Sequence, residues 1–115
     1  MKDDFVFRGH ICITFELLST NLYELMKENS YQGLSLIHIR KIAIQILSAV
    51  RLLRRLKIVH CDFKPENIML RHKNRLALKL IDFGSACYED AKPYTYVQSR
   101  YYRAPEIILG VPYGC

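Results

Sequence analysis

The sequence has few cysteines, and none of them forms a close pair with another. They are unevenly spaced, with no C-x-x-C motif, at Cys12, Cys61, Cys87 and Cys115. A structural zinc site or a disulfide framework needs cysteines at close and regular spacing. The spacing therefore argues against a structural zinc site and against a disulfide framework. It favours a reducing, intracellular setting.

The chain also lacks long apolar runs. A membrane-spanning helix needs about 20 consecutive apolar residues, and no stretch of this sequence reaches that length. The first ten residues, MKDDFVFRGH, carry acids where a signal peptide has a basic lead and a long apolar core. There is no internal repeat and no low-complexity tract. We predict a packed chain with neither a signal peptide nor a membrane partner.

The composition is that of a folded protein with excess positive charge. Half of the 115 residues are apolar and 11% are aromatic, so a packed core is expected within one domain at most. The net charge of +6 favours acidic or phosphate-bearing partners without identifying one. Both ends of the chain look abrupt, which predicts a fragment of a larger domain.

Three short strands are expected. Residues 11–15 are β-branched and aromatic, which indicates a buried strand. Residues 68–70 and 78–81 predict two further strands, joined by a polar turn into a hairpin. Residues 85–115 are rich in Tyr, Ser, Arg and Pro and show little periodicity.

Two helices are expected between the first strand and the hairpin. Residues 19–21 offer N-cap side chains for a short helix over residues 22–27. The long element covers residues 34–59, where apolar residues recur at steps of three and four. They predict one buried helix face, made of Leu36, Ile39, Ala43, Ile46, Val50 and Leu53. The opposite side is basic, with His38, Arg40, Lys41, Arg51, Arg54 and Arg55.

The basic side of the long helix has two interpretations. It is either an amphipathic element that binds a membrane or nucleic acid, or the solvated outer face of a core helix. A second apolar stripe widens the buried side beyond what a surface-lying helix needs, at Ile42, Leu47, Leu52 and Leu56. The core helix is favoured, and no nucleic-acid partner is expected. Salt-sensitive DNA binding by the full domain would revive the other interpretation.

Polar side chains with a common chemistry lie at the ends of these elements. Asn67 precedes the first strand of the hairpin and Asp82 follows the second. Because a hairpin returns its end beside its start, their oxygens can converge, and two such ligands suit Mg²⁺. Asp62, in the loop after the long helix, is then free to accept a proton from a substrate hydroxyl. Lys64 is placed to steady a transferring phosphoryl group.

The alternative is a surface ion-pair loop, formed by Asp62, Lys64 and Glu66 and followed by an ordinary turn at residues 82–84. Either segment alone fits that interpretation. Their joint occurrence, in this order and at this separation, favours phosphoryl-transfer chemistry.

Three motifs resemble those of protein kinases. HCDFKPEN at residues 60–67 resembles the catalytic loop H-R-D-L-K-x-x-N, DFG at 82–84 the metal-binding motif, and APE at 104–106 the end of the activation segment. The cysteine at 61, FGSAC at 83–87 and YTYVQSRYYRAPE at 94–106 resemble the dual-specificity tyrosine-regulated kinases (DYRK). FELL at 15–18 and NLYELM at 21–26 resemble that family's hinge and next helix. The resemblance covers the whole chain.

The resemblance implies an α+β, protein-kinase-like fold that is only partly present. Residues 1–18 correspond to the end of the N-lobe and the hinge, and residues 19–115 to the helical C-lobe through the APE motif. The glycine-rich loop, the strand lysine, the helix glutamate and the lower C-lobe have no counterpart in these residues. Phe63 departs from the family's customary Leu.

The resemblance also implies a role for each matching residue. Asp62 corresponds to the catalytic base and Lys64 to its phosphate-binding neighbour, while Asn67 and Asp82 correspond to the Mg²⁺ ligands. Phe15 corresponds to the gatekeeper. The remaining ATP contacts are the hinge backbone at Glu16, Leu17 and Leu18, the adenine-sandwiching Met69 and Ile81, and Asn21 near the ribose. For the apolar members, plain core packing is the alternative.

Cys61 stands where most kinases have an arginine that pairs with a phosphate on the activation segment. A thiol does not form that pair, so other cations must receive the charge. In the family, the second tyrosine of the Tyr-x-Tyr motif is autophosphorylated, which points to Tyr96. Arg100 and Arg103 follow it at four and seven residues, and guanidinium groups suit phosphotyrosine well.

Two further residues are expected to contact the substrate. Arg103 resembles the arginine that lets proline-directed kinases accept Pro after the target Ser or Thr. Glu66 is a candidate partner for an upstream substrate Arg, with a local salt bridge to Lys64 as the alternative. Cys61 and Cys87 either approach as a redox-sensitive pair or stay as two buried free thiols, and the second is favoured.

The function implied is ATP- and Mg²⁺-dependent phosphorylation of protein Ser and Thr residues, with tyrosine autophosphorylation. The 115 residues alone are expected to be inactive. The alternative is a non-catalytic, kinase-like fragment that only binds partners, which the intact set of four polar side chains disfavours. The family's cytoplasmic and nuclear residence is an implication only, and the sequence does not indicate the oligomeric state.

Overall fold

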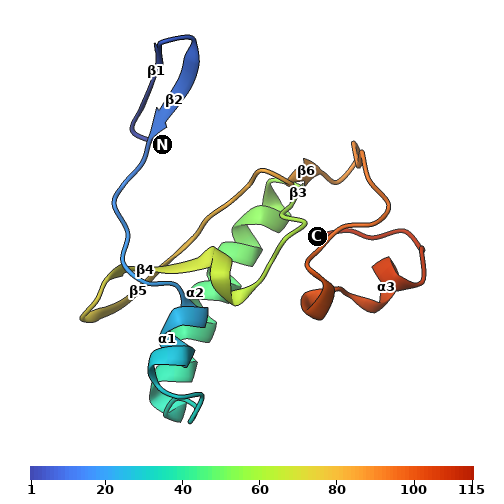
Figure 1. Cartoon of the computed structure of the whole chain (residues 1–115). Coiled ribbons are helices and arrows are strands. Elements are labelled where there is room, and N and C mark those ends of the chain that lie inside the picture. Colours follow the sequence, from blue (N-terminus) through green and yellow to red (C-terminus); the bar gives the residue numbers. More distant parts are fainter.

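The structure is a computed structural model that describes all residues from 1 to 115. Figure 1 shows a helical and hairpin body, a detached N-terminal hairpin and a long C-terminal segment with little regular structure. The strands are β1 (Asp3–Phe7), β2 (His10–Thr14), β3 (Ile58–Val59), β4 (Ile68–His72), β5 (Arg75–Leu80) and β6 (Cys87–Tyr88). The helices are α1 (Leu22–Glu28), α2 (Leu36–Arg55) and α3 (Pro105–Ile108), with short 3-10 turns η1 (Pro65–Asn67) and η2 (Arg100–Tyr102).

The N-terminal hairpin stands apart from the rest of the molecule. β1 and β2 pair antiparallel, and an extended stretch joins them to α1 (Figure 1). The prediction of a strand near residues 11–15 is confirmed, but the prediction that it is buried is wrong, because Ile11 is 79% exposed. The sheet has only two strands, and no other element packs on either face.

The short helix α1 is confirmed, and its start is set by a capping box. The Asn21 side-chain oxygen accepts the Glu24 N–H at 2.8 Å, and the Glu24 carboxylate accepts the Asn21 N–H at 3.3 Å. This reciprocal pair satisfies two backbone donors that a helix start leaves free. Just before the cap, Ser19 N–H donates to the Leu70 carbonyl and Leu70 N–H donates to the Thr20 carbonyl. The segment entering α1 therefore runs alongside β4.

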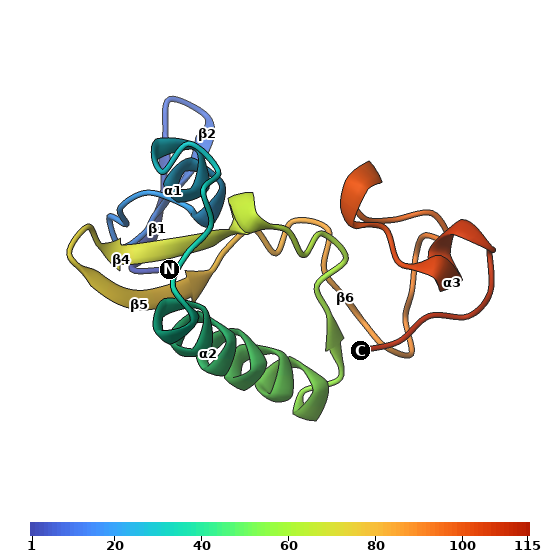
Figure 2. The ribbon, with the colours of Figure 1, turned by 90° about the horizontal axis from the view of Figure 1, so that it is seen from below.

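The long helix α2 packs against β5, as Figure 2 shows. Gln45 joins the two elements, since its amide nitrogen donates to the Leu76 carbonyl at 2.6 Å and its oxygen accepts the Leu78 N–H at 2.9 Å. The predicted inward face is partly wrong. Leu36 is 82% exposed, and the half-buried line is instead formed by Ile42, Ala43, Gln45, Ile46, Ala49 and Leu53. It is shifted because one hairpin covers only one strip of the helix.

The predicted hairpin is β4 and β5, paired from Ile68 with Leu80 to Leu70 with Leu78. A second pairing was not expected from the sequence: β3 joins β6 antiparallel, with Val59 opposite Cys87. This contact anchors the segment after β5 beside the start of the loop at residues 60–67.

Few residues are buried, and most of them lie in that loop or in β4 directly after it. The buried residues are Ile42, His60, Cys61, Asn67, Ile68, Leu70 and Ile107. None of the helices combines the length and apolarity needed to cross a membrane.

Candidate active site

His60 fixes the start of the predicted catalytic loop. Its ring is buried, Nδ1 accepts the Asp62 N–H at 3.2 Å, and Nε2 lies 3.0 Å from the Ile81 carbonyl oxygen. Because Nδ1 acts as an acceptor, the proton sits on Nε2, which donates to Ile81. The ring also contacts Phe83 edge-on, with centroids 4.8 Å apart. His60 therefore ties the loop backbone to the residues on both sides of Asp82.

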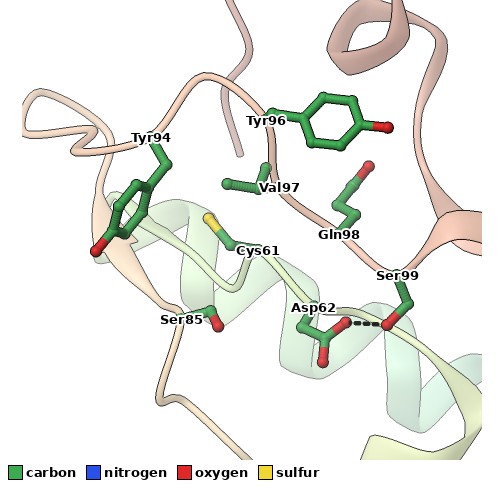
Figure 3. A pocket seen from close by; sticks show the side chains of 8 residues that line it. All are labelled: Cys61, Asp62, Ser85, Tyr94, Tyr96, Val97, Gln98 and Ser99. Atoms are coloured by element: carbon green, nitrogen blue, oxygen red, sulfur yellow. Dashed lines mark hydrogen bonds between the residues drawn. The ribbon is translucent and has the colours of Figure 1, made fainter.

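Asp62 is held by three polar neighbours. Its Oδ1 accepts the Ser99 hydroxyl at 2.7 Å (Figure 3), and its Oδ2 lies 2.7 Å from Lys64 Nζ. The Asn67 amide nitrogen donates to the Asp62 carbonyl at 2.9 Å and to Oδ2 at 3.2 Å. The Asp62 side chain is only 19% exposed. The acid, the amine and the amide thus form one connected, half-buried cluster instead of a solvated surface loop.

These contacts set the charges of Asp62 and Lys64. Burial favours the neutral carboxyl, but hydrogen bonds from Lys64 and Ser99 outweigh it and lower the pKa of Asp62. The hydrogen bond to Asp62 raises the pKa of Lys64 against the opposing effect of burial, and the charges of Glu66 and Asp82 add to the rise. The carboxylate is therefore ionised at neutral pH and able to accept a proton.

Asn67 and Asp82 lie at adjacent ends of the hairpin. Ile81 N–H donates to the Asn67 carbonyl at 2.9 Å, so Asp82 directly follows the residue paired with Asn67. Asp82 has a φ of 60°, and its Oδ1 accepts the Gly84 N–H at 3.3 Å. The Asn67 amide nitrogen is engaged by Asp62, which leaves its side-chain oxygen as a free acceptor. One carboxylate and one amide oxygen fit Mg²⁺, which takes its remaining ligands from phosphates and water.

Ser99 is a site residue that the sequence prediction missed. Its hydroxyl donates to Asp62 Oδ1 and accepts from Lys64 Nζ at 3.0 Å, although 35 residues separate it from Lys64. The signal was present, because Ser99 lies inside the DYRK-like stretch at residues 94–106. A single serine in a segment without periodicity gave no reason to select it.

The two neighbouring thiols are both free. Cys61 Sγ lies 3.7 Å from Cys87 Sγ, and Cys61 is buried while Cys87 is half-buried. Burial first, and the contact with Cys87 second, raise the pKa of Cys61 to about 11. Cys61 is therefore an uncharged thiol at neutral pH, as the favoured interpretation of this pair expects.

Tyr96 stacks against the guanidinium of Arg103. Its hydroxyl accepts a hydrogen bond from Arg103 Nη1, and Arg103 Cζ lies 3.9 Å from the ring centroid. Arg103 also donates to the Val97 carbonyl at 2.9 Å and to the Gln98 carbonyl at 2.8 Å. Arg100 is exposed and forms no ion pair. Of the two arginines predicted to pair with a phosphate on Tyr96, Arg103 contacts the Tyr96 hydroxyl and Arg100 does not.

Glu66 has a buried carboxylate oxygen without a partner. Its Oε2 accepts no hydrogen bond, whereas Lys64 pairs with Asp62 instead of Glu66. The predicted alternative, a Glu66–Lys64 salt bridge, is therefore wrong. An unpartnered buried carboxylate oxygen is costly unless a donor arrives.

The predicted adenine contacts lie along the link after β2 and on the hairpin. Phe15 is 64% exposed and Leu17 is 92% exposed, while Leu18 is half-buried. Met69 lies on β4 and Ile81 directly follows β5, and both are half-buried. Because paired residues share a face of a hairpin and alternate along each strand, the two side chains lie on the same face, so both would contact an adenine from one side instead of enclosing it.

A cavity of about 340 Å³ lies between the catalytic loop and the segment that carries Ser99. Figure 3 shows its walls, with Asp62 and Ser99 at one end and the thiol of Cys61 between Tyr94 and Asp62. The lining residues are Cys61, Asp62, Ser85, Tyr94, Tyr96, Val97, Gln98 and Ser99.

Comparisons with known proteins agree with the motifs. The family model described as "Protein kinase domain" matches residues 1–115. The chain is 58% identical over 113 residues to dual specificity tyrosine-phosphorylation-regulated kinase 4 of Homo sapiens, covering 98% of this chain and 22% of that protein. It is 58% identical over 114 residues to kinase 3 of the same series from Mus musculus, covering 99% and 20%. It is 56% identical over 114 residues to the kinase mbk-2 of Caenorhabditis elegans, covering 99% and 14%. The chain thus spans about a fifth or less of the length of these relatives.

Proposed function

Because the chain belongs to the protein kinase domain family, and within it to the dual-specificity tyrosine-regulated kinases, we propose that it supplies the catalytic centre of a protein Ser/Thr kinase. We use "the complete domain" for these 115 residues within a whole kinase domain. The rest of that domain comes either from a longer coding sequence or from human kinase 4, into which the 115 residues are grafted. That domain transfers the γ-phosphate of ATP to hydroxyls of protein substrates. The observation that carries the proposal is the ionised, half-buried Asp62 hydrogen-bonded to Lys64 and Ser99.

Asp62 acts as the base in this reaction. It accepts the proton of the substrate hydroxyl while the hydroxyl oxygen forms its bond to the γ-phosphorus and the bond from that phosphorus to ADP breaks. The Lys64 ammonium, 2.7 Å from the base, neutralises negative charge that develops on the transferring group. Asn67 orients the base by donating to both its carbonyl and its carboxylate.

The oxygens of Asn67 and Asp82 are proposed to hold Mg²⁺. Protein kinases use ATP and Mg²⁺ generally, and the metal neutralises phosphate charge when bound. The cysteine-free, oxygen-only donor set at the hairpin ends suits that cation. Met69 and Ile81 share the hairpin face that would support the adenine, the hinge backbone would bind its edge, and Phe15 would be the gatekeeper.

The surroundings of Arg103 support a preference for proline after the target residue. Arg103 occupies the carbonyl oxygens of Val97 and Gln98, and Gln98 has a left-handed φ of 71°. A substrate residue docking here with a free N–H finds these backbone acceptors already used. Proline has no N–H to leave unsatisfied, so it is favoured at this position.

Tyr96 and Glu66 are proposed to serve activation and substrate binding. A phosphate on the Tyr96 hydroxyl would meet the Arg103 guanidinium that already contacts it, and Arg100 is free to join. The unpartnered Glu66 oxygen suits a guanidinium from an upstream substrate Arg, which would satisfy it.

The decisive test replaces the base. In the complete domain, Asp62→Asn should reduce kcat on a Ser-Pro peptide by about 10²- to 10⁴-fold, the usual contribution of a positioned general base. Binding of Mg-ATP should change little, because Asp62 contacts the hydroxyl and not the nucleotide. The matched control is Asp90→Asn, an exposed acid after β6 that takes part in no ion pair. Equal turnover in wild type and Asp62→Asn would remove Asp62 from the mechanism.

A further inference from the structure

Only one residue of the link at residues 15–18 makes polar contacts with the rest of the molecule. These residues lie outside every helix and strand, and they form no backbone–backbone hydrogen bond. Backbone pairing with β4 begins only at Ser19. Between Thr14 and Ser19, the side chain of Glu16 makes the only hydrogen bonds, and it makes them to the β4–β5 hairpin.

The Glu16 carboxylate bridges the two strands of that hairpin. Its Oε1 accepts from Arg71 Nε at 2.9 Å, and its Oε2 pairs with Lys79 Nζ. Arg71 lies on β4 and Lys79 on β5, so each carboxylate oxygen binds one strand. The Glu16 side chain is 29% exposed, but those of Arg71 and Lys79 are 46% and 44% exposed, so solvent partly screens both ion pairs. The hydrogen bonds from Lys79 and Arg71 lower the pKa of Glu16, so the carboxylate is charged at neutral pH.

The bridge lies on the face of the hairpin that supports the adenine in the proposed function. Lys79 is directly opposite Met69 in the β4–β5 register, and cross-strand partners point to the same face. The carboxylate therefore reaches the strand pair at the level of Met69. Glu16 thus sets the spacing between two parts of the proposed adenine site. One is the link, whose backbone would bind the edge of the adenine, and the other is Met69, whose side chain would lie below the ring.

We propose that Glu16 is a positioning residue for the nucleotide, whose carboxylate holds the hinge against the adenine-binding face of the β4–β5 hairpin through Arg71 and Lys79. This role rests on the proposed function and is additional to the backbone contact expected at Glu16. The two cations act through Glu16 and are not proposed to contact the nucleotide. Without the bridge, residues 15–18 would sample several positions, and the site would have to be ordered when the nucleotide binds.

The test uses adenosine, an uncharged probe, so that a change of charge at Glu16 acts on binding only through geometry. In the complete domain, Glu16→Gln keeps the size of the side chain and removes its charge. We expect the Kd for adenosine, measured by calorimetry, to rise about three- to tenfold, the range for losing two partly screened ion pairs. The KM for Mg-ATP should rise by a similar factor, and kcat on a saturating peptide should stay within about twofold.

Two sets of variants separate the bridge from a general loss of structure. Glu28→Gln on α1 is the matched control, since Glu28 is exposed and forms no ion pair, and it should bind adenosine like the wild type. Lys79→Gln should weaken adenosine binding, and adding it to Glu16→Gln should cost less than the sum of the single effects. Swapping the charges, with Glu16→Lys and Lys79→Glu together, should restore part of the affinity relative to either single change.

The outcomes distinguish the inference from the function on which it rests. If the wild-type domain neither binds adenosine nor phosphorylates a peptide with Mg-ATP, the proposed function fails. If it does both, but Glu16→Gln binds adenosine as the wild type does, the bridge is a surface feature and the inference is wrong. Strictly additive effects of Glu16→Gln and Lys79→Gln would also contradict it, because independent residues do not form one bridge.

Discussion

At the residue scale, the site depends on a carboxylate that stays charged although it is partly buried. Burial alone would raise the pKa of Asp62, and the contacts with Lys64 and Ser99 reverse that effect. Lys64 could be found from the motif, but Ser99 comes from a segment 37 residues away. The catalytic loop is therefore completed by a residue from outside it.

The Ser99 contact predicts a change in the pH dependence of catalysis. A base with a lowered pKa works throughout the neutral range, and its activity is lost as the pH falls through that lowered value. Ser99→Ala removes a hydrogen bond that favours the charged form, so the pKa of Asp62 should rise. The acid limb of the kcat profile of the complete domain should then move to higher pH. Superimposable profiles for Ser99→Ala and wild type would mean that the hydroxyl does not act on the base.

A second serine provides the control for that measurement. Ser48 lies on α2, where its hydroxyl donates to the Ile44 carbonyl of its own helix at 2.7 Å. Ser48→Ala removes the same group at a distance from the site and should leave the acid limb where it is.

At the element scale, one polar side chain joins the long helix to the hairpin that has Asn67 and Asp82 at its ends. Gln45 acts as a hydrogen-bonding partner for the free edge of β5, accepting from one residue and donating to another two positions away. The helix thereby sets the position of β5, whose end leads directly to Asp82.

This contact predicts a specific loss of stability. Gln45→Met fills nearly the same volume but leaves the Leu78 N–H and the Leu76 carbonyl without partners in a half-buried setting. Each unsatisfied group costs about 1–3 kcal/mol, so the complete domain should lose roughly 2 kcal/mol or more in urea unfolding with an unchanged m-value. Gln32→Met, at an exposed position between the helices, should have an effect near zero. Equal unfolding midpoints for Gln45→Met and wild type would contradict this role of Gln45.

The elements also show which features a sequence can predict. The N-cap side chains at residues 19–21, the helix periodicity and the polar turn after β4 are local signals, and the structure contains all three elements. The predicted inward face of α2 was partly wrong, because the strip of an apolar helix that becomes covered depends on the elements packed against it. The β3–β6 pair was missed for a similar reason. Each of these strands has only two residues, which is too short for a periodic signal, and their pairing depends on segments far apart in the sequence.

The motif residues were easier to predict than their contacts. Asn67 and Asp82 stand at the two ends of a hairpin that local rules locate, so the sequence could place them at adjacent ends. The free oxygen of Glu66 and the Arg103 contact with Tyr96 depend on how an irregular segment folds back on the loop. Neither contact could be obtained from spacing.

At the scale of the whole molecule, the chain exposes more surface than a compact protein of its size. Its accessible surface is 9047 Å², against about 6,500 Å² expected for a folded monomer of 13.5 kDa. Its radius of gyration is 16.1 Å, against about 13 Å for a compact domain of this length. Only 7 of 115 residues are buried, so the packing energy is concentrated near the catalytic loop.

This surface predicts the behaviour of the 115 residues expressed alone. The exposed side chains of α2, among them Leu36, Ile37 and Leu47, leave an apolar surface that favours association. We expect the isolated chain to bind a hydrophobic dye, to elute as mixed oligomers and to show no peptide phosphorylation. The complete domain should elute as one species under the same conditions. A monomeric isolated chain with a cooperative thermal transition would contradict this expectation.

The double engagement of Asp62 has a consequence for the resting enzyme. A carboxylate without protein partners in such a cleft would bind water. That water could then attack the γ-phosphate of ATP in place of the substrate hydroxyl. Here one oxygen faces a hydroxyl tethered to the chain and the other faces an ammonium. We expect hydrolysis of ATP by water to stay slow until a protein hydroxyl reaches the carboxylate, which Ser99 and Lys64 continue to contact.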